Sequence, residues 1–194
     1  MNIWQLLSDR RMCRRYLERP VPRAILLRVL EAARRTPSAG HAQGVRFAVL
    51  TEQSQRDRVA LAFGEEEFLR RGFPPWLSTA PVHLIVAASQ SAYKERYAKP
   101  DKACEPDEWQ VPYHVLDAGK SLMALYLAAQ EVGLSCGYLG PHAGENLVDL
   151  FELPTDWTFV GLVTLGYRHP ESRGRTRSER LGWREFDEVV RWLS

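Results

Sequence analysis

The sequence predicts an α+β fold built around one central sheet. Segments with helical periodicity outnumber the strand-like runs, and the two kinds do not follow a strict βαβα alternation. The chain also lacks the Gly-x-Gly-x-x-Gly pattern of a Rossmann dinucleotide-binding unit. With 194 residues, of which 45% are hydrophobic and 26% charged, it has the size and composition of one soluble globular domain. We therefore expect a single domain over residues 1–194.

The first half of the chain begins with two predicted helices. Residues 2–9 have apolar side chains at helical spacing, and residues 22–35 form a stronger amphipathic helix that starts near Pro22 and ends before Pro37. The apolar face of the second helix consists of Ile25, Leu26, Val29, Leu30 and Ala33. After it we expect strands at residues 46–51 and 82–88, with a weaker helix at residues 53–62.

The second half of the chain is dominated by one long predicted helix. Residues 113–132 are apolar on nearly every side, so this helix is expected to lie in a core or in a subunit interface. Residues 91–111 before it mix aromatic with charged side chains and are expected on the surface. Further elements are expected at residues 135–139 (strand), 143–151 (helix) and 158–167 (strand). The last 27 residues lack clear periodicity until residues 186–190, so we expect them to be disordered or held by a partner.

Composition excludes several classes of protein. The net charge of +2 does not imply general nucleic-acid affinity, although arginines cluster near both ends of the chain. No apolar run reaches the ~20 residues of a membrane-spanning helix, and the first residues lack the pattern of a secretory signal. Three widely spaced cysteines do not form a disulfide framework, and no zinc-ligand spacing occurs. We expect a cytoplasmic protein without a metal, a membrane or a nucleic-acid partner.

Two short motifs resemble catalytic signatures but occur in the wrong structural context. Residues 133–137 match the Gly-x-Ser-x-Gly of a hydrolase nucleophile elbow, which needs a strand before the serine and a helix after it. Here the predicted order is reversed. Residues 119–121 (Gly-Lys-Ser) resemble the end of a P-loop, but His114 stands where the upstream glycine is required.

Three other motifs carry a functional signal together. Residues 10–16 read Arg-Arg-x-x-Arg-x-aromatic, a Pro-Val-Pro spacer follows at residues 20–22, and the next helix closes in Pro-Ser-x-x-x-x-Gln at residues 37–43. Residues 133–140 read Gly-Leu-Ser-Cys-Gly-Tyr-Leu-Gly. In order and spacing these motifs resemble the FMN-dependent nitroreductase family, within the nitroreductase and flavin destructase-like superfamily. The likeness extends over nearly the whole chain.

The resemblance implies a fold and an assembly. Members have a central, mostly antiparallel sheet surrounded by helices, and they form intertwined homodimers with two FMN sites at the subunit interface. By this likeness, residues 168–194 form a C-terminal extension that packs on the partner subunit.

The resemblance also implies which residues bind FMN. Arg10 and Arg11 would bind the phosphate, whose charge near −2 requires several converging cations, with Arg180 or Arg184 completing the set. Arg14 occupies the place of the cation that stabilises negative charge at the N1/O2 edge of the reduced ring. Gly140 would offer a main-chain N–H to N5. The full set of expected FMN contacts is Arg10, Arg11, Met12, Arg14, Pro37, Ser38, Ala39, Gly40, His41, Gln43, Leu139, Gly140, Arg180 and Arg184.

The implied activity is a ping-pong oxidation and reduction. NADH or NADPH reduces bound FMN, and a small acceptor such as a nitroaromatic, a quinone or an unsaturated carbonyl compound then takes the electrons. No side-chain acid or base is expected, and the sequence leaves the dinucleotide and the acceptor open. The aromatic residues available to line the substrate pocket are Phe68, Trp76, Tyr93, Trp109 and Tyr113.

The sequence departs from the family pattern at four places. Met12 replaces a frequent serine, His41 a frequent asparagine and Gly44-Val45 a usual Pro-Trp, while Pro141 removes one of two main-chain donors. The alternative within the superfamily is flavin destructase, which makes 5,6-dimethylbenzimidazole from FMN with oxygen. That enzyme depends on an acidic residue and a serine where this chain has Met12 and Gly140. A flavin-binding protein without turnover is the other alternative.

Overall fold

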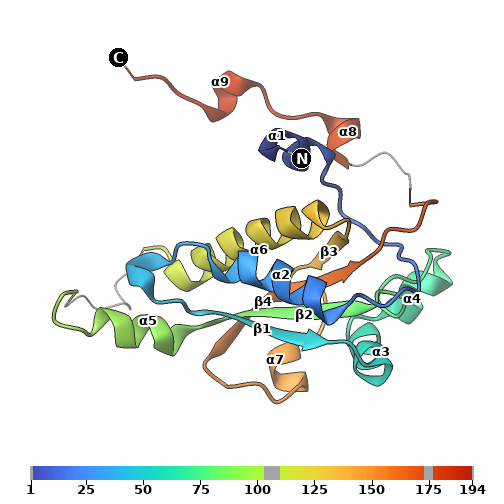
Figure 1. The fold of residues 1–194 in the computed structure, drawn as a ribbon, viewed down its shortest axis with the longest axis horizontal. Coiled ribbons are helices and arrows are strands. Elements are labelled where there is room, and N and C mark those ends of the chain that lie inside the picture. Colours follow the sequence, from blue (N-terminus) through green and yellow to red (C-terminus); the bar gives the residue numbers. More distant parts are fainter. Residues whose placement is uncertain (1, 103–109, 173–176, 194) are drawn as a thin grey trace.

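The computed structural model describes residues 2–102, 110–172 and 177–193 (Figure 1). Helices are arranged around a single sheet. In chain order the elements are α1 (Ile3–Asp9), α2 (Arg23–Arg34), the 3₁₀ turn η1 (Ala39–His41), β1 (Val45–Leu50), α3 (Gln53–Ala62), α4 (Glu65–Arg70), β2 (Val82–Ser89), α5 (Gln90–Tyr97), α6 (Tyr113–Glu131), β3 (Ser135–Leu139), α7 (Leu147–Leu150), β4 (Trp157–Gly166), α8 (Arg177–Leu181) and α9 (Phe186–Val189).

The four described strands form one antiparallel sheet in the order β1-β2-β4-β3. Its register aligns Val45 with Ala88, His83 with Thr164 and Cys136 with Leu165. The α+β class and the antiparallel sheet expected from the sequence are therefore confirmed. Among the described strands, β1 and β3 lie at the two edges.

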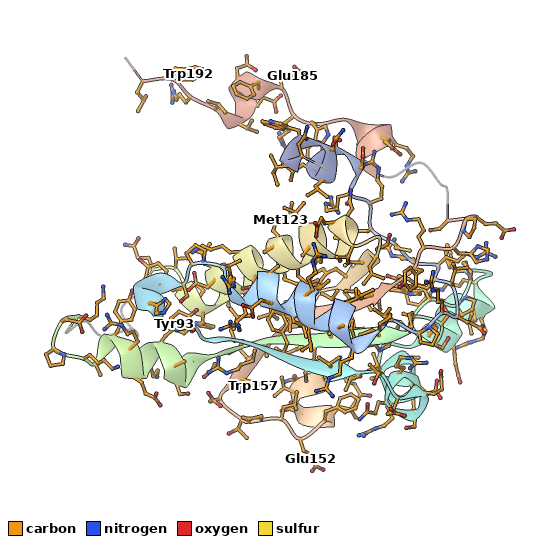
Figure 2. The ribbon with its side chains drawn as sticks, viewed as in Figure 1. Tyr93, Met123, Glu152, Trp157, Glu185 and Trp192 are labelled. Carbon is orange, nitrogen blue, oxygen red and sulfur yellow. The ribbon has the colours of Figure 1, made fainter. Side chains whose placement is uncertain are left out.

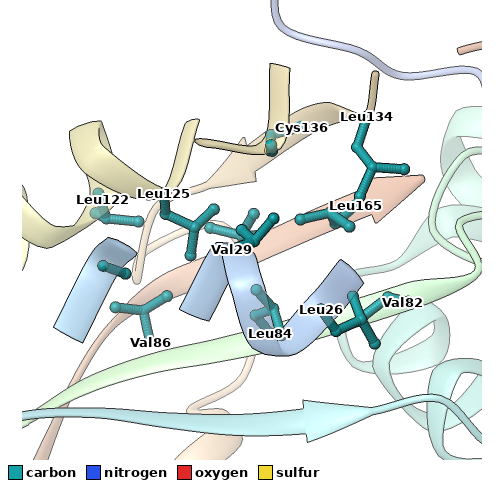
Figure 3. Packing of buried hydrophobic residues seen from close by; sticks show 13 residues of the cluster. Leu26, Val29, Val82, Leu84, Val86, Leu122, Leu125, Leu134, Cys136 and Leu165 are labelled. Carbon is teal, nitrogen blue, oxygen red and sulfur yellow. The ribbon is translucent and has the colours of Figure 1, made fainter. Parts of the chain in front are cut away.

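Helices cover both faces of this sheet, and β2 shows why. Val82, Leu84 and Val86 point to one face, where they pack with α2 and α6, whereas Ile85 and Ala87 point to the other, where they pack with α3 and α7. This alternation is the two-residue period of a strand buried on both sides. Figure 3 shows the first core, in which Val29 of α2 and Leu125 of α6 approach Val86 and Leu84 of β2.

Several expectations from the sequence need correction. Residues 91–111 were expected only as a surface segment, but Gln90–Tyr97 form the helix α5, and the helix α4 was not predicted. The helix expected at residues 143–151 is confined to Leu147–Leu150. Gly144 explains part of this difference, because a Cβ there would lie 2.8 Å from the carbonyl oxygen of Ala62, so the preceding residues pack as a tight turn.

The C-terminal segment runs past α1 and away from the sheet (Figure 1). Figure 2 shows Glu185 and Trp192 on this outlying part of the chain, on the α6 side of the molecule. Its large apolar side chains are between 61% and 89% exposed: Leu181, Trp183, Phe186, Val189, Trp192 and Leu193. Such a concentration of exposed apolar surface is typical of a segment that binds another surface. Within the described residues, no helix is long and apolar enough to cross a membrane.

Candidate functional site

The arginine segment (residues 10–16) is docked on one end of the sheet by its main chain. The Cys13 N–H donates to the Cys136 carbonyl oxygen of β3 at 2.7 Å. Just past β4, the His169 N–H donates to the Arg15 carbonyl oxygen at 3.0 Å. Tyr16 forms an isolated antiparallel bridge with Arg168. These bonds leave the arginine side chains of the segment available for other partners.

Tyr16 fixes the same segment from inside the molecule. Its side chain is 4% exposed, and its hydroxyl lies 2.8 Å from Thr164 Oγ1 and donates to the Cys13 carbonyl oxygen at 3.0 Å. Burial raises the pKa of this phenol well above its ordinary value of 10, so Tyr16 remains a protonated donor. The aromatic residue of the Arg-Arg-x-x-Arg-x-aromatic motif is therefore an anchor.

Arg14 lies where the arginine segment meets β3. Its guanidinium carbon is 5.6 Å from the centroid of the Trp76 ring, within range of a cation–π interaction. Gly140 follows the last residue of β3, and a Cβ built there would meet no atom within 4 Å, so its main chain is open to approach. The predicted cation and the predicted main-chain donor thus belong to segments joined by the Cys13–Cys136 hydrogen bond.

Arg10 and Arg11 line a cavity of about 560 Å³. Arg11 is already engaged there, because its Nη2 lies 3.0 Å from Glu179 Oε1 of α8. Arg168 Nη2 donates to the Arg11 carbonyl oxygen at 3.1 Å, so a further guanidinium lies beside the arginine segment. The remaining lining residues are Trp4, Leu7, Ser8, Met123, Glu179 and Trp183.

The Pro-Ser loop (residues 37–43) has a strained backbone. Gly40, His41 and Gln43 have positive φ angles of 58°, 58° and 51°. For residues other than glycine, this region costs about 1–3 kcal/mol and persists only where the surroundings impose it. Such strain is concentrated at functional sites in general, which agrees with the loop's predicted role.

Three hydrogen bonds impose this conformation. The Ala39 N–H donates to Asp117 Oδ2 at 2.7 Å, and Arg96 Nε donates to the Gly40 carbonyl oxygen at 2.6 Å. The Gln43 N–H donates to Ser38 Oγ at 2.9 Å. The loop is therefore held from α6, from α5 and from within itself.

Asp117 is the central acceptor of this arrangement. Its side chain is 1% exposed on α6, and it accepts from Ala39 N, from the Tyr93 hydroxyl and from Lys120 Nζ, each at 2.7 Å. Burial and the bond to Asp117 raise the pKa of Tyr93 well above its ordinary value, so Tyr93 donates its proton in this bond. Each oxygen of this buried carboxylate thus has at least one donor.

The structure places the predicted pocket residues in different surroundings. Trp76 and Tyr93 are buried at 6% and 1% exposure, Phe68 is exposed beside Phe73, and Tyr113 is half-buried at the start of α6. Trp109 lies outside the described residues. At the C-terminus Arg180 is exposed, and Arg184 pairs with Glu188 at 3.1 Å.

The arginine segment and the Pro-Ser loop lie at opposite ends of α2. The chain enters α2 at the end near α4 and leaves it at the end near α5 (Figure 1). Twelve helical residues at 1.5 Å each make α2 about 18 Å long. One chain therefore keeps the two predicted halves of the FMN site apart.

Two buried carboxylates, one near each of these segments, escaped the sequence analysis. Asp117 was hidden in a helix interpreted as apolar all round, although its spacing of three from Lys120 was an available signal of a polar face. Glu65 lies in an acidic run that is typical of a solvated surface, yet it is only 4% exposed. No pattern in the sequence distinguishes it from Glu66.

The fold and these motifs define a class. The chain matches the model of the nitroreductase family over residues 7–167, which is most of its length, and it belongs to that family. The structure agrees: a nitroreductase family protein from Streptococcus pneumoniae superposes with a TM-score of 0.73 at 18% identity, covering 99% of this chain and 100% of that one. A structure from Exiguobacterium sibiricum solved in complex with FMN gives a TM-score of 0.75 at 17% identity, covering 100% and 98%.

Curated relatives have more than one activity. An FMN reductase [NAD(P)H] of Bacillus subtilis is 26% identical over 173 residues, covering 86% of this chain and 65% of that protein. This chain thus spans somewhat less than two thirds of that relative. A 5,6-dimethylbenzimidazole synthase of Rhodospirillum rubrum is 24% identical, covering 92% of this chain and 87% of the relative.

Proposed function

We propose that this protein is an FMN-dependent oxidoreductase that uses NADH or NADPH to reduce a small acceptor. The observation that carries the proposal is that the arginine segment is hydrogen-bonded to β3 at Cys13, next to Arg14. A guanidinium held beside the strand that leads to the open main chain of Gly140 would meet the N1/O2 and N5 edges of one flavin ring. The FMN-bound neighbour and the FMN reductase of B. subtilis support the same cofactor.

The residues of this chain fit the chemical groups of FMN. Arg10 and Arg11 face a cavity and would bind the phosphate once Arg11 releases Glu179. Arg14 would oppose negative charge at the pyrimidine edge, and the Gly140 N–H would donate to N5. The strained Pro-Ser loop would present Ser38 and Gln43 to the ribityl chain or the ring edge. FMN, when bound, supplies the hydride chemistry, while the protein supplies orientation and charge.

The protein is proposed to act as a homodimer. The arginine segment and the Pro-Ser loop are separated by the length of α2, which supports a site that takes one of them from each subunit. The exposed apolar C-terminal segment supports this arrangement, because packing on a partner would bury it. A cytoplasmic location also remains part of the proposal.

The acceptor is proposed to be a nitroaromatic, a quinone or an unsaturated carbonyl compound. A second candidate function follows from the R. rubrum relative, which is a 5,6-dimethylbenzimidazole synthase. Met12 and Gly140 weigh against that function, because the acidic and serine side chains expected of flavin destructase are missing.

The visible spectrum of the purified protein tests the proposal first. We expect flavin absorption bands that bleach when NADH or NADPH is added without air. Bands that persist would exclude NAD(P)H as the donor and favour the synthase or a non-catalytic flavin protein. A protein that is colourless and cannot be reconstituted with FMN would refute the proposal.

A substitution at Arg10 tests the phosphate contact. Arg10→Ala should weaken FMN binding by about 1.5–3 kcal/mol, the scale of a hydrogen bond between charged groups. Arg15→Ala is a matched control, because Arg15 belongs to the same segment but pairs with Glu171 at 2.7 Å. Titration with FMN followed by fluorescence measures both variants, and equal affinities in the two would remove Arg10 from the site.

A further inference from the structure

The Trp76 side chain is held in one position by the core and by strand β3. Its side chain is 6% exposed in the core that includes Ile85 and Leu162. It also lies against β3, because a Cβ at Gly137 would come within 2.8 Å of its Cζ3 and within 2.5 Å of Thr164 Oγ1. Only a residue without a side chain at position 137 allows the indole to lie this close to the strand.

Glu65 holds the main chain that carries Trp76. This buried carboxylate accepts from the N–H groups of Trp76 at 2.7 Å, Leu77 at 2.6 Å and Ser78 at 3.1 Å. Bonds from main-chain donors to an ionised acceptor are among the stronger hydrogen bonds in proteins. The position of the Trp76 ring is therefore set by the core on one side and by Glu65 on the other.

The Arg14 guanidinium lies over the ring of Trp76. In the described part of the chain no carboxylate forms an ion pair with Arg14, in contrast to Arg11, which is paired with Glu179. A carboxylate partner cancels much of the charge of a guanidinium and occupies its N–H groups. An aromatic face fixes the same cation while leaving both its charge and its in-plane donors available.

We propose that Trp76, held by Glu65, is a positioning residue that fixes Arg14 at the pyrimidine edge of the flavin and thereby raises the reduction potential of the flavin. This inference rests on the proposed function. A cation that stays in place stabilises the negative charge of the reduced ring more than one that moves freely in solvent, because less ordering is required when the charge appears. Trp76 acts through Arg14 and does not itself contact a substrate.

The midpoint potential of bound FMN tests this role. Trp76→Leu removes the aromatic face, and we expect reduced FMN to lose about tenfold in affinity relative to oxidised FMN, a shift of about 30 mV to more negative potential for a two-electron couple. Trp76→Phe keeps a weaker aromatic face and should give a smaller shift in the same direction. If the leucine variant does not fold, the phenylalanine variant decides, and an unchanged potential overturns the inference.

A second background separates positioning from general damage to the core. In an Arg14→Gln protein the cation is already absent, so adding Trp76→Phe or Trp76→Leu should leave the potential unchanged. An equal shift with and without Arg14 would show that Trp76 acts by another route and would overturn the inference. A wild-type protein that binds no FMN would refute the proposed function, whereas a flavin-loaded wild type with insensitive Trp76 variants would refute only this inference.

Discussion

The arginine segment and the Pro-Ser loop are both predicted to bind FMN, yet the protein holds them in different ways. The arginine segment is attached by main-chain hydrogen bonds to Cys136 and His169 and by the buried Tyr16. The Pro-Ser loop is attached by side chains of two helices, chiefly Asp117 and Arg96, and its backbone is strained.

This difference indicates where each region is vulnerable. A segment docked largely through its main chain tolerates changes in its arginine side chains, because these side chains do not carry the attachment. A strained loop depends on every group that over-determines it. We therefore expect substitutions remote from FMN to disturb the loop more than the arginine segment.

The largest effect is expected at Asp117. Asp117→Ala leaves the buried Tyr93 hydroxyl and the half-buried Ala39 N–H without their acceptor, which should lower the free energy of unfolding by about 4 kcal/mol. The affinity for FMN should also fall, because the Pro-Ser loop loses the hydrogen bond that holds Ala39. Urea unfolding and FMN titration measure the two quantities at a fixed protein concentration.

Lys120→Met is the control for that substitution. Lys120 contacts the same carboxylate, but its side chain is 43% exposed, so its loss should cost no more than about 1 kcal/mol. Similar losses in both variants would mean that the contact between Asp117 and the loop contributes little.

The pH dependence of stability tests the burial of His83 in the core next to the arginine segment. Burial lowers the pKa of His83 to about 4, and His83 lies opposite Thr164, the partner of Tyr16. Between about pH 6.5 and pH 4 the unfolded chain binds a proton that the folded chain does not. The free energy of unfolding should therefore fall as the pH falls through this window, by about 3 kcal/mol in total.

His83→Gln provides the comparison, since its amide can still donate to the Leu77 carbonyl oxygen that His83 Nε2 contacts at 2.9 Å. Unfolding in urea at pH 7.5 and at pH 4.5 should show a smaller decrease in the variant. The same decrease in both proteins would assign the acid sensitivity to other groups.

The smallest effect is expected at Tyr16. Tyr16→Phe removes one hydroxyl but keeps the ring and the main-chain bonds, so the free energy of unfolding should fall by about 1 kcal/mol. FMN affinity should stay within twofold of the wild type. Thermal unfolding with FMN titration checks both, and a large loss of affinity would show that the hydroxyl, rather than the main chain, positions the arginines.

The sequence predicted the elements whose pattern reflects burial. For α2, α6, β2 and β4 the predicted bounds lie within one residue of the observed ones, because apolar periodicity records which face is covered. α5 was missed because among its eight residues only Tyr93 is buried, so no periodic apolar face exists. The sequence motifs singled out the arginine segment and the Pro-Ser loop as predicted FMN contacts.

The groups that hold these segments were harder to predict. Asp117 and Glu65 are buried only because donors from distant parts of the chain converge on them. A hydrogen bond across 78 residues leaves no periodic trace in a single sequence. For the same reason the sequence did not indicate that Arg14 lies over the Trp76 ring, because the position of this ring depends on Glu65 and Gly137.

The length of α2 has a genetic consequence. If each FMN site takes its arginine segment from one subunit and its Pro-Ser loop from the other, a chain defective at Arg10 and a chain defective at Ser38 damage different halves of the site. Hybrid dimers of the two would contain one doubly damaged site and one intact site. Two alleles that are inactive separately would then complement each other when they are expressed in the same cell.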